Sequence, residues 1–221
     1  MTSDPGGPGG MSDAEYRDLY EGFYARAGSD LSAVPWASLR PHPRLVTWLD
    51  SHPGGHGRSA LVIACGLGDD AEFAAASGYA TTAFDFSPTA IQRCHERFPD
   101  SSVDYQVADL FALPGSWSAA FDLVVEIRTL QSMPPDRRAA AVAAIARTVR
   151  PGGHLLVHTF VADEAEEFDG PPWPVTPSQL DGFRAAGLRR VDDTEEVGQF
   201  PGETPRPVRA LTAILQRPLD G

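Results

Sequence analysis

Cysteine, positive charge and long apolar runs are all scarce in this sequence of 221 residues. Its two cysteines, Cys65 and Cys94, are too few for a disulfide framework and do not have the spacing of metal ligands. No apolar run approaches the ~18–20 residues that a membrane-spanning helix needs. The sequence therefore predicts neither a disulfide-stabilised domain nor a metal centre nor a membrane protein.

The scarcity of positive charge leaves a formal net charge of −12. Because nucleic-acid affinity depends on Lys and Arg contacts to phosphates, an acidic chain without a basic cluster is not expected to bind nucleic acid. Residues 1–11 are rich in Gly and Pro and lack the basic and apolar regions of a signal peptide, so we interpret them as a flexible tail. These observations lead us to expect a cytoplasmic protein, either a monomer or a homodimer.

From residue 59 onward, short apolar segments alternate with segments of helical periodicity. Strands are expected at 59–64, 81–86, 102–108, 121–127 and 154–161, and helices at 69–77, 88–98, 135–149 and 176–186. This alternation predicts an α/β fold with a doubly wound, mostly parallel sheet. Two further helices, at 12–27 and 42–51, predict an N-terminal helical cap over residues 12–57, ahead of a main domain over 58–221.

The C-terminus departs from this alternation. Two strands are expected, at 188–196 and 208–216, and the connection between them contains three prolines and two glycines. Such a connection cannot form the helix that usually joins parallel strands, so the two strands are expected to be antiparallel. The sequence thus predicts a seven-stranded, Rossmann-like sheet with an antiparallel C-terminal strand.

The clearest local motif is a pair of glycines, Gly66 and Gly68, which follows the first apolar strand and Cys65 and leads directly into a helix. Glycines at this point allow a sharp turn and let a ligand approach the backbone closely. With Ala71 the motif also fits the G-x-G-x-x-A pattern, so a dinucleotide site is an alternative.

Acidic residues end the next three strands. Asp85 lies 19 residues after Gly66, Asp109 follows the third strand, and Glu126 ends the fourth. The carboxyl ends of parallel strands meet at one edge of a sheet, where Asp85 could accept both ribose hydroxyls and Asp109 an adenine amino group. The sequence predicts a nucleoside site at this edge, which also includes the residues after the first two acids, Phe86 and Leu110.

Residues 61–157 resemble the S-adenosylmethionine-binding core of class I methyltransferases, and residues 149–157 resemble the loop before its fifth strand. The family's sheet closes with an antiparallel strand, which the dinucleotide-binding fold lacks. The resemblance implies S-adenosylmethionine as cofactor and methyl transfer to the sulfur, oxygen or nitrogen of a small molecule. An NAD(P)-dependent oxidoreductase and a non-catalytic nucleoside-binding module remain as alternatives.

Three shorter segments are similar to thiopurine and thiol S-methyltransferase-like proteins: residues 35–43, which contain Trp36, residues 68–73, and Arg128-Thr-Leu-Gln131. That similarity implies that Trp36 covers the methionine end of the cofactor and that Arg128 lines the acceptor pocket. His42, near Trp36, is a second candidate for the chemical step. His158, inside the fifth strand, is interpreted as a packed core histidine.

Overall fold

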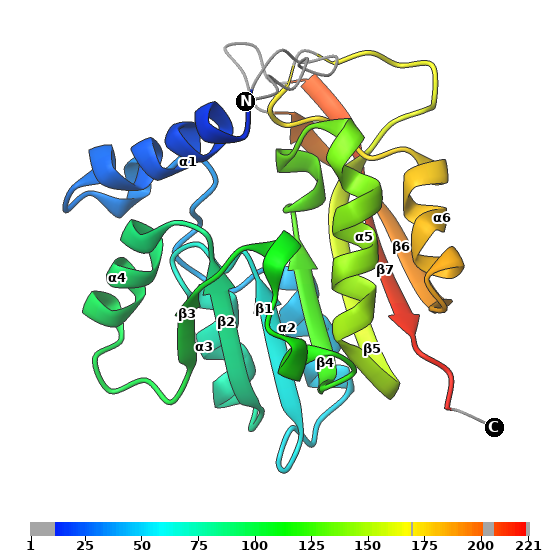
Figure 1. Cartoon of the computed structure of the whole chain (residues 1–221), viewed down its shortest axis with the longest axis horizontal. Coiled ribbons are helices and arrows are strands. Elements are labelled where there is room, and N and C mark those ends of the chain that lie inside the picture. Colours follow the sequence, from blue (N-terminus) through cyan, green and yellow to red (C-terminus); the bar gives the residue numbers. More distant parts are fainter. Residues whose placement is uncertain (1–11, 169, 201–205, 220–221) are drawn as a thin grey trace. The chain divides into compact units, whose positions relative to one another are not determined.

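The computed structural model describes residues 12–168, 170–200 and 206–219 (Figure 1). The chain divides into two compact units, residues 1–112 and 113–221. The predicted tail, 1–11, lies outside the described residues.

In the first unit, three parallel strands lie in the order β3-β2-β1, which makes β2 the middle one. Their bounds are β1 (Ser59–Ile63), β2 (Ala80–Asp85) and β3 (Asp104–Val107). All of β1 after its first residue is buried. A strand covered on both faces needs an unbroken apolar run, which is the pattern that predicted β1.

Two crossover helices connect these strands. Helix α3 (Asp69–Ala76) packs against β1 and β2, and α4 (Pro88–Arg97) packs against β2 and β3. The N-terminus of α4 is fixed by its sequence: the Ser87 hydroxyl accepts a hydrogen bond from the Ala90 amide at 2.9 Å, and Pro88 occupies the first helical position. A short 3-10 helix, η2 (Leu110–Ala112), ends this unit.

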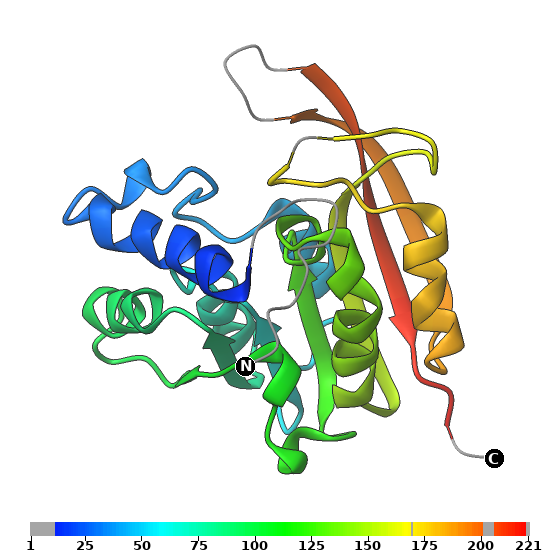
Figure 2. The same cartoon turned by 45° about the horizontal axis from the view of Figure 1, so that its top comes forward.

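The N-terminal segment contains α1 (Asp13–Ala27), the 3-10 helix η1 (Leu31–Ala33) and α2 (Pro43–Ser51). Ser12 caps α1 in a reciprocal capping box with Glu15, as the spacing of the two residues predicts. Figure 2 shows α1 beside α4, and the two helices share a small buried cluster of apolar residues: Tyr24, Ala27, Val34, Leu67 and Ala90. The predicted boundary of a separate cap at residue 57 stays a prediction.

The second unit contains four strands in the order β4-β5-β7-β6. They are β4 (Phe121–Ile127), β5 (Val149–Val161), β6 (Arg189–Phe200) and β7 (Arg206–Gln216). Strand β4 is parallel to β5, whereas β7 is antiparallel to both β5 and β6. The predicted antiparallel C-terminal strand is therefore confirmed.

The helices expected at 135–149 and 176–186 are present. The first is η5 (Pro135–Arg137) followed by α5 (Arg138–Thr148), and the second is α6 (Pro177–Ala185). Two further 3-10 helices, η3 (Gly115–Trp117) and η4 (Leu130–Ser132), were not expected from the sequence. Helices α5 and α6 pack side by side on one face of the strands (Figure 1). The expected loop at 150–153 is instead part of β5, where the pairing with β4 shifts between Phe121 and Leu123, a local irregularity that absorbs the extra residues.

The strands together form a seven-stranded mixed sheet, which confirms the predicted α/β fold class with its antiparallel C-terminal strand. Within the described ranges, none of the helices combines the length and hydrophobicity that a bilayer crossing requires.

Candidate functional site

The chain leaves β1 through a turn with left-handed backbone. Ala64, Gly66 and Gly68 have φ angles of 47°, 54° and 90°. Gly68 is the position where only glycine fits, because a Cβ there would lie 2.5 Å from the Tyr105 hydroxyl. The turn therefore needs glycine for its backbone conformation and also for packing.

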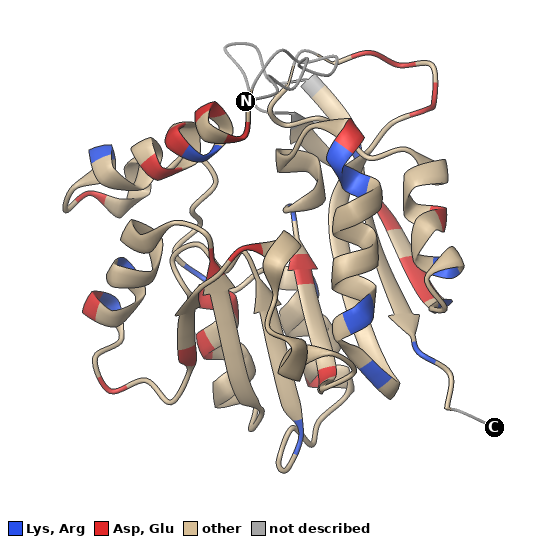
Figure 3. Ribbon diagram, viewed as in Figure 1, with Lys and Arg blue, Asp and Glu red and all other residues tan. Residues whose placement is uncertain are grey.

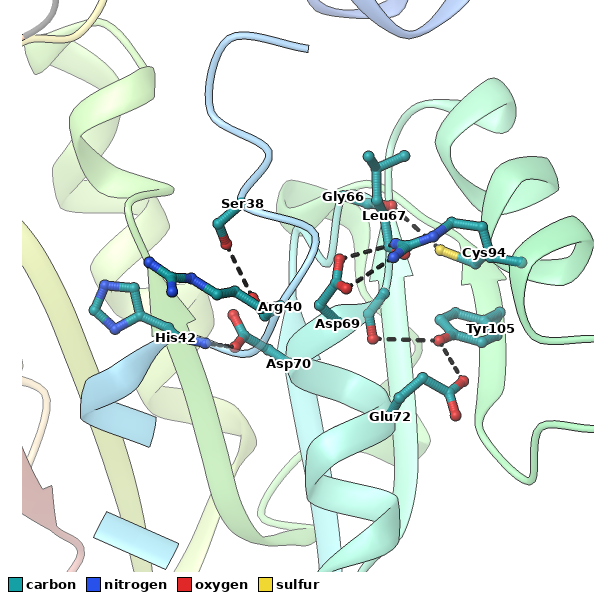
Figure 4. A network of polar contacts seen from close by, with 12 residues as sticks. Ser38, Arg40, His42, Gly66, Leu67, Asp69, Asp70, Glu72, Cys94 and Tyr105 are labelled. Carbon is teal, nitrogen blue, oxygen red and sulfur yellow. Dashed lines mark hydrogen bonds and ion pairs between the residues drawn. The ribbon is translucent and has the colours of Figure 1, made fainter. Parts of the chain in front are cut away.

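Side chains from two helices and a strand hold the glycine turn in place (Figure 4). Asp69, at the start of α3, receives two hydrogen bonds of 2.8 Å from the Arg97 guanidinium, which also donates to the Leu67 carbonyl. The Tyr105 hydroxyl donates to Glu72 at 2.7 Å. A bidentate Arg–carboxylate pair fixes orientation as well as distance, so the turn is supported before any ligand reaches it.

The two cysteines lie against the same turn. The Cys65 amide donates to the Phe84 carbonyl at 2.8 Å, and the Cys94 thiol donates to the Gly66 carbonyl at 3.3 Å. The hydrogen bond between the two cysteine side chains, together with burial, holds the pKa of Cys65 well above its ordinary value. A thiol with a raised pKa is a poor nucleophile, so Cys65 contributes to the shape of the turn, and its predicted contact with cofactor stays a prediction.

Asp85, at the end of β2, is buried and joins two loops. One carboxylate oxygen accepts from the Gly66 amide at 3.0 Å, and the other accepts from the Ser87 amide at 2.9 Å. Burial raises the pKa of Asp85 to about 6, although both of these hydrogen bonds act to lower it. Each carboxylate oxygen can accept more than one hydrogen bond, so Asp85 can still receive the hydroxyls of a ribose.

The second acid of the series, Asp109, follows β3. One of its oxygens accepts from the Phe111 amide at 2.9 Å, and the other receives the Arg17 guanidinium at 2.6 Å. Phe86, half-buried after β2, lies under the same guanidinium, whose carbon is 5.3 Å from the ring centroid. Leu110 is buried at the start of η2. Four residues of the predicted nucleoside site thus lie in one unit: Asp85, Phe86, Asp109 and Leu110.

Helix α1 contributes residues that the sequence did not point to. Glu21 accepts hydrogen bonds from the hydroxyls of Ser87 and Thr89, one turn along α1 from Arg17. Arg17 and Glu21 are four residues apart, a spacing that puts both on one face of the helix. That spacing was the available signal. What the face contacts lies 66 to 92 residues away in the sequence and could not be predicted from it.

Trp36 belongs to an aromatic cluster next to the glycine turn. Its indole N–H donates to the Tyr24 hydroxyl at 3.2 Å, and its ring lies edge-on to Phe23 and Tyr24. A Cβ at Gly66 would be 3.2 Å from that same hydroxyl. Trp36 is 36% exposed. It therefore has a packing role and an accessible surface, and the predicted cover over the cofactor stays a prediction.

His42 serves as the N-cap of α2. Its ring Nδ1 accepts from the Arg44 amide at 3.3 Å, and its backbone amide donates to Asp70 at 2.6 Å (Figure 4). The Nδ1 atom of His42 is thus already used as a hydrogen-bond acceptor at the start of α2. The predicted chemical role of His42 stays a prediction that this contact does not favour.

In the second unit, Glu126 is fully buried at the end of β4. One carboxylate oxygen accepts from the amides of Thr129 and Leu130, at 2.7 and 2.9 Å. The other has no hydrogen-bond partner among the described residues. Burial raises the pKa of Glu126 to about 7. Both observed bonds hold the loop after β4, so the structure shows a loop-capping role, and the predicted cofactor contact stays a prediction.

Arg128, the other candidate for the chemical step, is exposed directly after β4 and has a left-handed φ of 64°. Its guanidinium carbon lies 5.4 Å from the centroid of the Phe160 ring. His158 is buried, with Nδ1 2.9 Å from the Thr212 hydroxyl. The interpretation of His158 as a packed core histidine is confirmed.

Comparison with known protein families points to the same region of the chain. A family model described as a methyltransferase domain matches residues 60–153, the stretch that carries β1, the glycine turn and the acids. The match covers less than half of the chain, so this segment is similar to methyltransferase domains.

Relatives of known name add detail. A ubiquinone biosynthesis O-methyltransferase of Azotobacter vinelandii is 31% identical over 120 residues, which is 53% of this chain and 51% of the relative. A probable thiol methyltransferase of Arabidopsis thaliana is 28% identical over 205 residues, 84% of this chain and 87% of the relative. The chain spans about half the length of the curated O-methyltransferases that it matches.

A solved structure supports the fold. The N-methyltransferase NodS of Bradyrhizobium japonicum, in complex with S-adenosylhomocysteine, has a TM-score of 0.71 with this chain at 20% identity. The alignment covers 91% of this chain and 99% of NodS.

The residues present fit S-adenosylmethionine, the cofactor that the sequence resemblance implies. The carboxylates of Asp85 and Asp109 accept hydrogen bonds, and a nucleoside offers hydroxyl and amino donors. Gly66 and Gly68 give the left-handed turn next to Asp85. Within the part of the chain that the structure describes, no group of three or more His, Cys, Asp or Glu side chains could hold a metal ion.

Proposed function

We propose that this chain transfers a methyl group from S-adenosylmethionine to a small-molecule acceptor. The observation that carries the proposal is the hydrogen bond of 3.0 Å between the Gly66 amide and the buried carboxylate of Asp85. It joins the glycine turn to the acid that would receive the ribose. Asp109 and Phe86, within the same unit, offer an acceptor and a flat apolar surface for adenine.

The protein's part in such a reaction is to bind, to orient and to exclude water. When bound, S-adenosylmethionine supplies a methyl group on a sulfonium leaving group, so the protein need not create a strong electrophile. Asp85 would fix the ribose, and the predicted role of Trp36 is to cover the methionine end. Fixing the donor in this way raises the effective concentration of the two reactants.

Within this proposal, a sulfur nucleophile is the acceptor that we favour. The thiol methyltransferase relative aligns over 84% of this chain, whereas the O-methyltransferase relative aligns over 53%. A thiol is partly ionised near neutral pH and needs little help from a base. The rings of His42 and His158 are engaged in a helix cap and a core contact, which agrees with an acceptor that arrives as an anion. Arg128 would then stabilise the thiolate.

The surface charge supports a small acceptor over a nucleic acid. Figure 3 shows acidic residues along the ribbon in the first turn of α1 and in the loop between β5 and α6, which holds Asp163, Glu164, Glu166 and Glu167. With a net charge of −12, the chain would repel a phosphate backbone. The proposal includes action in the cytoplasm as a monomer or a homodimer.

An acceptor screen tests the proposal. The protein is incubated with S-adenosylmethionine and, separately, with hydrosulfide, an aryl thiol, a phenol and an amine, and S-adenosylhomocysteine is measured by chromatography. We expect formation that depends on a thiol, that is lost in Asp85→Asn and that is retained in Asp104→Asn. Preference for the phenol would move the acceptor from sulfur to oxygen. Tight S-adenosylhomocysteine binding with no turnover on any acceptor would favour a non-catalytic nucleoside-binding module.

A further inference from the structure

Phe86 is covered by one face of α1. The Arg17 guanidinium carbon lies 5.3 Å from the centroid of its ring. Two tyrosines of α1 complete the cover: the Tyr16 ring lies at 5.9 Å, and the Tyr20 ring lies edge-on at 6.3 Å. The aromatic surface that follows the ribose acid therefore has a planar cation on it and aromatic rings beside it.

Asp109 holds the same guanidinium by its edge. One terminal nitrogen of Arg17 is 2.6 Å from one oxygen of Asp109, and the other oxygen is oriented by the Phe111 amide at 2.9 Å. The carboxylate is thus fixed by its own loop. It presents one oxygen to whatever flat donor lies above Phe86.

A guanidinium and an adenine would make the same kinds of contact with such a site. Both are planar and delocalised, both can lie on an aromatic ring, and both carry N–H donors in the plane at their edge. Phe86 offers the ring, and Asp109 offers the acceptor at the edge. The Arg17 guanidinium lies over the Phe86 ring and is bonded to one oxygen of Asp109, which are the two contacts that an adenine would need.

We propose that Arg17 competes with the adenine of the cofactor for Phe86 and Asp109. The inference rests on the proposed function, because it takes these two residues as the adenine-binding part of the site. An adenosine-bearing ligand would have to displace the Arg17 side chain. Specificity for such a ligand would then include the free-energy difference between the two occupants.

The contact is suited to displacement. The side chains of Arg17 and Asp109 are 40% and 37% exposed, so their ion pair is screened by solvent. Helix α1 is attached independently, because Glu21 binds the hydroxyls of Ser87 and Thr89. Arg17 can therefore leave Phe86 by rotating its side chain while α1 stays in place.

Calorimetry on three proteins tests the proposal: the wild type, Arg17→Met and Arg26→Met. Methionine keeps the apolar stem and the helix propensity of Arg17 but lacks its charge and donors. Arg26 is the matched control, because it is on α1 and lies over an aromatic ring, Phe23, but has no part in the Asp109 contact. Each protein is titrated with S-adenosylhomocysteine and with adenosine, which is uncharged and so insensitive to the general loss of a positive charge.

Arg17→Met should bind both ligands about three- to tenfold more tightly than the wild type, which is the size expected for losing one exposed ion pair and one cation–π contact. Arg26→Met should bind as the wild type does. Higher salt should also tighten adenosine binding to the wild type and not to Arg17→Met, since salt weakens the exposed pair.

Weaker binding by Arg17→Met would show that Arg17 holds the ligand, and unchanged binding would show that the ion pair is incidental. Either result overturns the competition and leaves the proposed function standing, because the wild type still binds. If no protein bound either ligand, the proposed function would fail, and this inference with it.

Discussion

Asp85 combines two properties that oppose each other. It is 3% exposed, which disfavours its charge, yet it accepts the amides of Gly66 and Ser87, which favours it. The result is a pKa of about 6, compared with the ordinary 3.8. A carboxylate that is balanced in this way can be ionised near neutral pH while it remains shielded from water, which strengthens its hydrogen bonds to a ribose.

Replacing Asp85 by asparagine should weaken the binding of S-adenosylhomocysteine by about 2–3 kcal/mol, the cost of losing charge-assisted hydrogen bonds to two hydroxyls. The matched control is Asp104→Asn, on β3, whose carboxylate is exposed and bonded to Gln106. Isothermal titration calorimetry measures both. If the two variants lost the same small amount, Asp85 would be a turn residue only.

Binding should also depend on pH through the same group. Below a pKa of about 6 Asp85 is protonated and donates where a ribose hydroxyl needs an acceptor. The affinity of the wild type for S-adenosylhomocysteine should therefore fall by about tenfold for each pH unit below that value. Asp85→Asn should show no such dependence, and a parallel decline in the variant would assign the effect to another group.

The stability of the folded chain responds in the opposite direction. Because the folded pKa of Asp85 lies above its ordinary value, the folded state binds the proton more tightly than the unfolded state. The stability that the protonated group contributes is fully present below about pH 3.8 and is lost as pH rises through about 6. Cofactor binding and fold stability thus make opposite demands on one carboxylate.

At the scale of elements, the loop after β4 depends on a buried acid. Glu126 accepts the amides of Thr129 and Leu130, at the start of η4, and Arg138 lies close enough to lower its pKa. Arg138 in turn donates to the carbonyls of Leu130, Trp173 and Pro174. These contacts tie η4, α5 and the segment before α6 together through two buried charges.

Glu126→Ala should lower the free energy of unfolding by about 2 kcal/mol, because two buried amides lose their hydrogen-bond acceptor. The variant no longer has to bury a carboxylate, and this gain offsets part of the cost. Denaturant titration measures this loss. The control is Glu96→Ala, because Glu96 pairs with Arg93 at the surface of α4 and its removal should change little. An equal loss in both variants would mean that the loop does not depend on Glu126.

The pH dependence of the free energy of unfolding separates the effect of the Glu126 charge from the effect of the side chain's size and hydrogen bonds. Its pKa in the fold, about 7, lies above the ordinary 4.5. The contribution of protonated Glu126 to the stability of the fold is therefore fully present below about pH 4.5, and it is lost as pH rises through about 7. Glu126→Gln cannot ionise, so its stability relative to the wild type should improve between about pH 5 and pH 8. A constant difference would contradict the raised pKa.

Elements with a local signature were predictable. The capping box of Ser12 and Glu15 and the Ser87-Pro88 start of α4 are read from adjacent residues, and both are present. The segment 150–153 was predicted wrongly, because Pro-Gly-Gly is typical of a loop. Pairing with neighbouring strands extends β5 through this segment with an irregular register, which no local pattern shows.

For the whole molecule, the sequence predicted the positions of the acids in the sheet but not the side chains that bind to them. Parallel strands end at one edge, so Asp85 and Asp109 could be assigned to that edge from strand order alone. The partner of Asp109 is on α1, 92 residues away. A contact of that separation depends on how a helix docks, and helix docking leaves no periodic trace in the sequence.

The charge pattern near the glycine turn favours one of the two adenosine-containing cofactors that the motif allows, S-adenosylmethionine, over the other, NAD. A pyrophosphate binds at a helix N-terminus, where amides and the helix dipole favour an anion. Here the first turn of α3 carries Asp69, Asp70 and Glu72. The charge of Asp69 is compensated by its pair with Arg97, but Asp70 and Glu72 add two further carboxylates, which disfavour a pyrophosphate and suit the ammonium group of S-adenosylhomocysteine.

We therefore expect S-adenosylhomocysteine to bind at least about tenfold more tightly than NAD, a difference of about 1.4 kcal/mol. Competition calorimetry at low salt, where charge repulsion is least screened, measures it directly. Asp70→Asn removes one charge from the first turn of α3 and should narrow the difference by improving NAD binding. A wild type that bound NAD more tightly would assign the glycine turn to a dinucleotide, in spite of the acids that follow it.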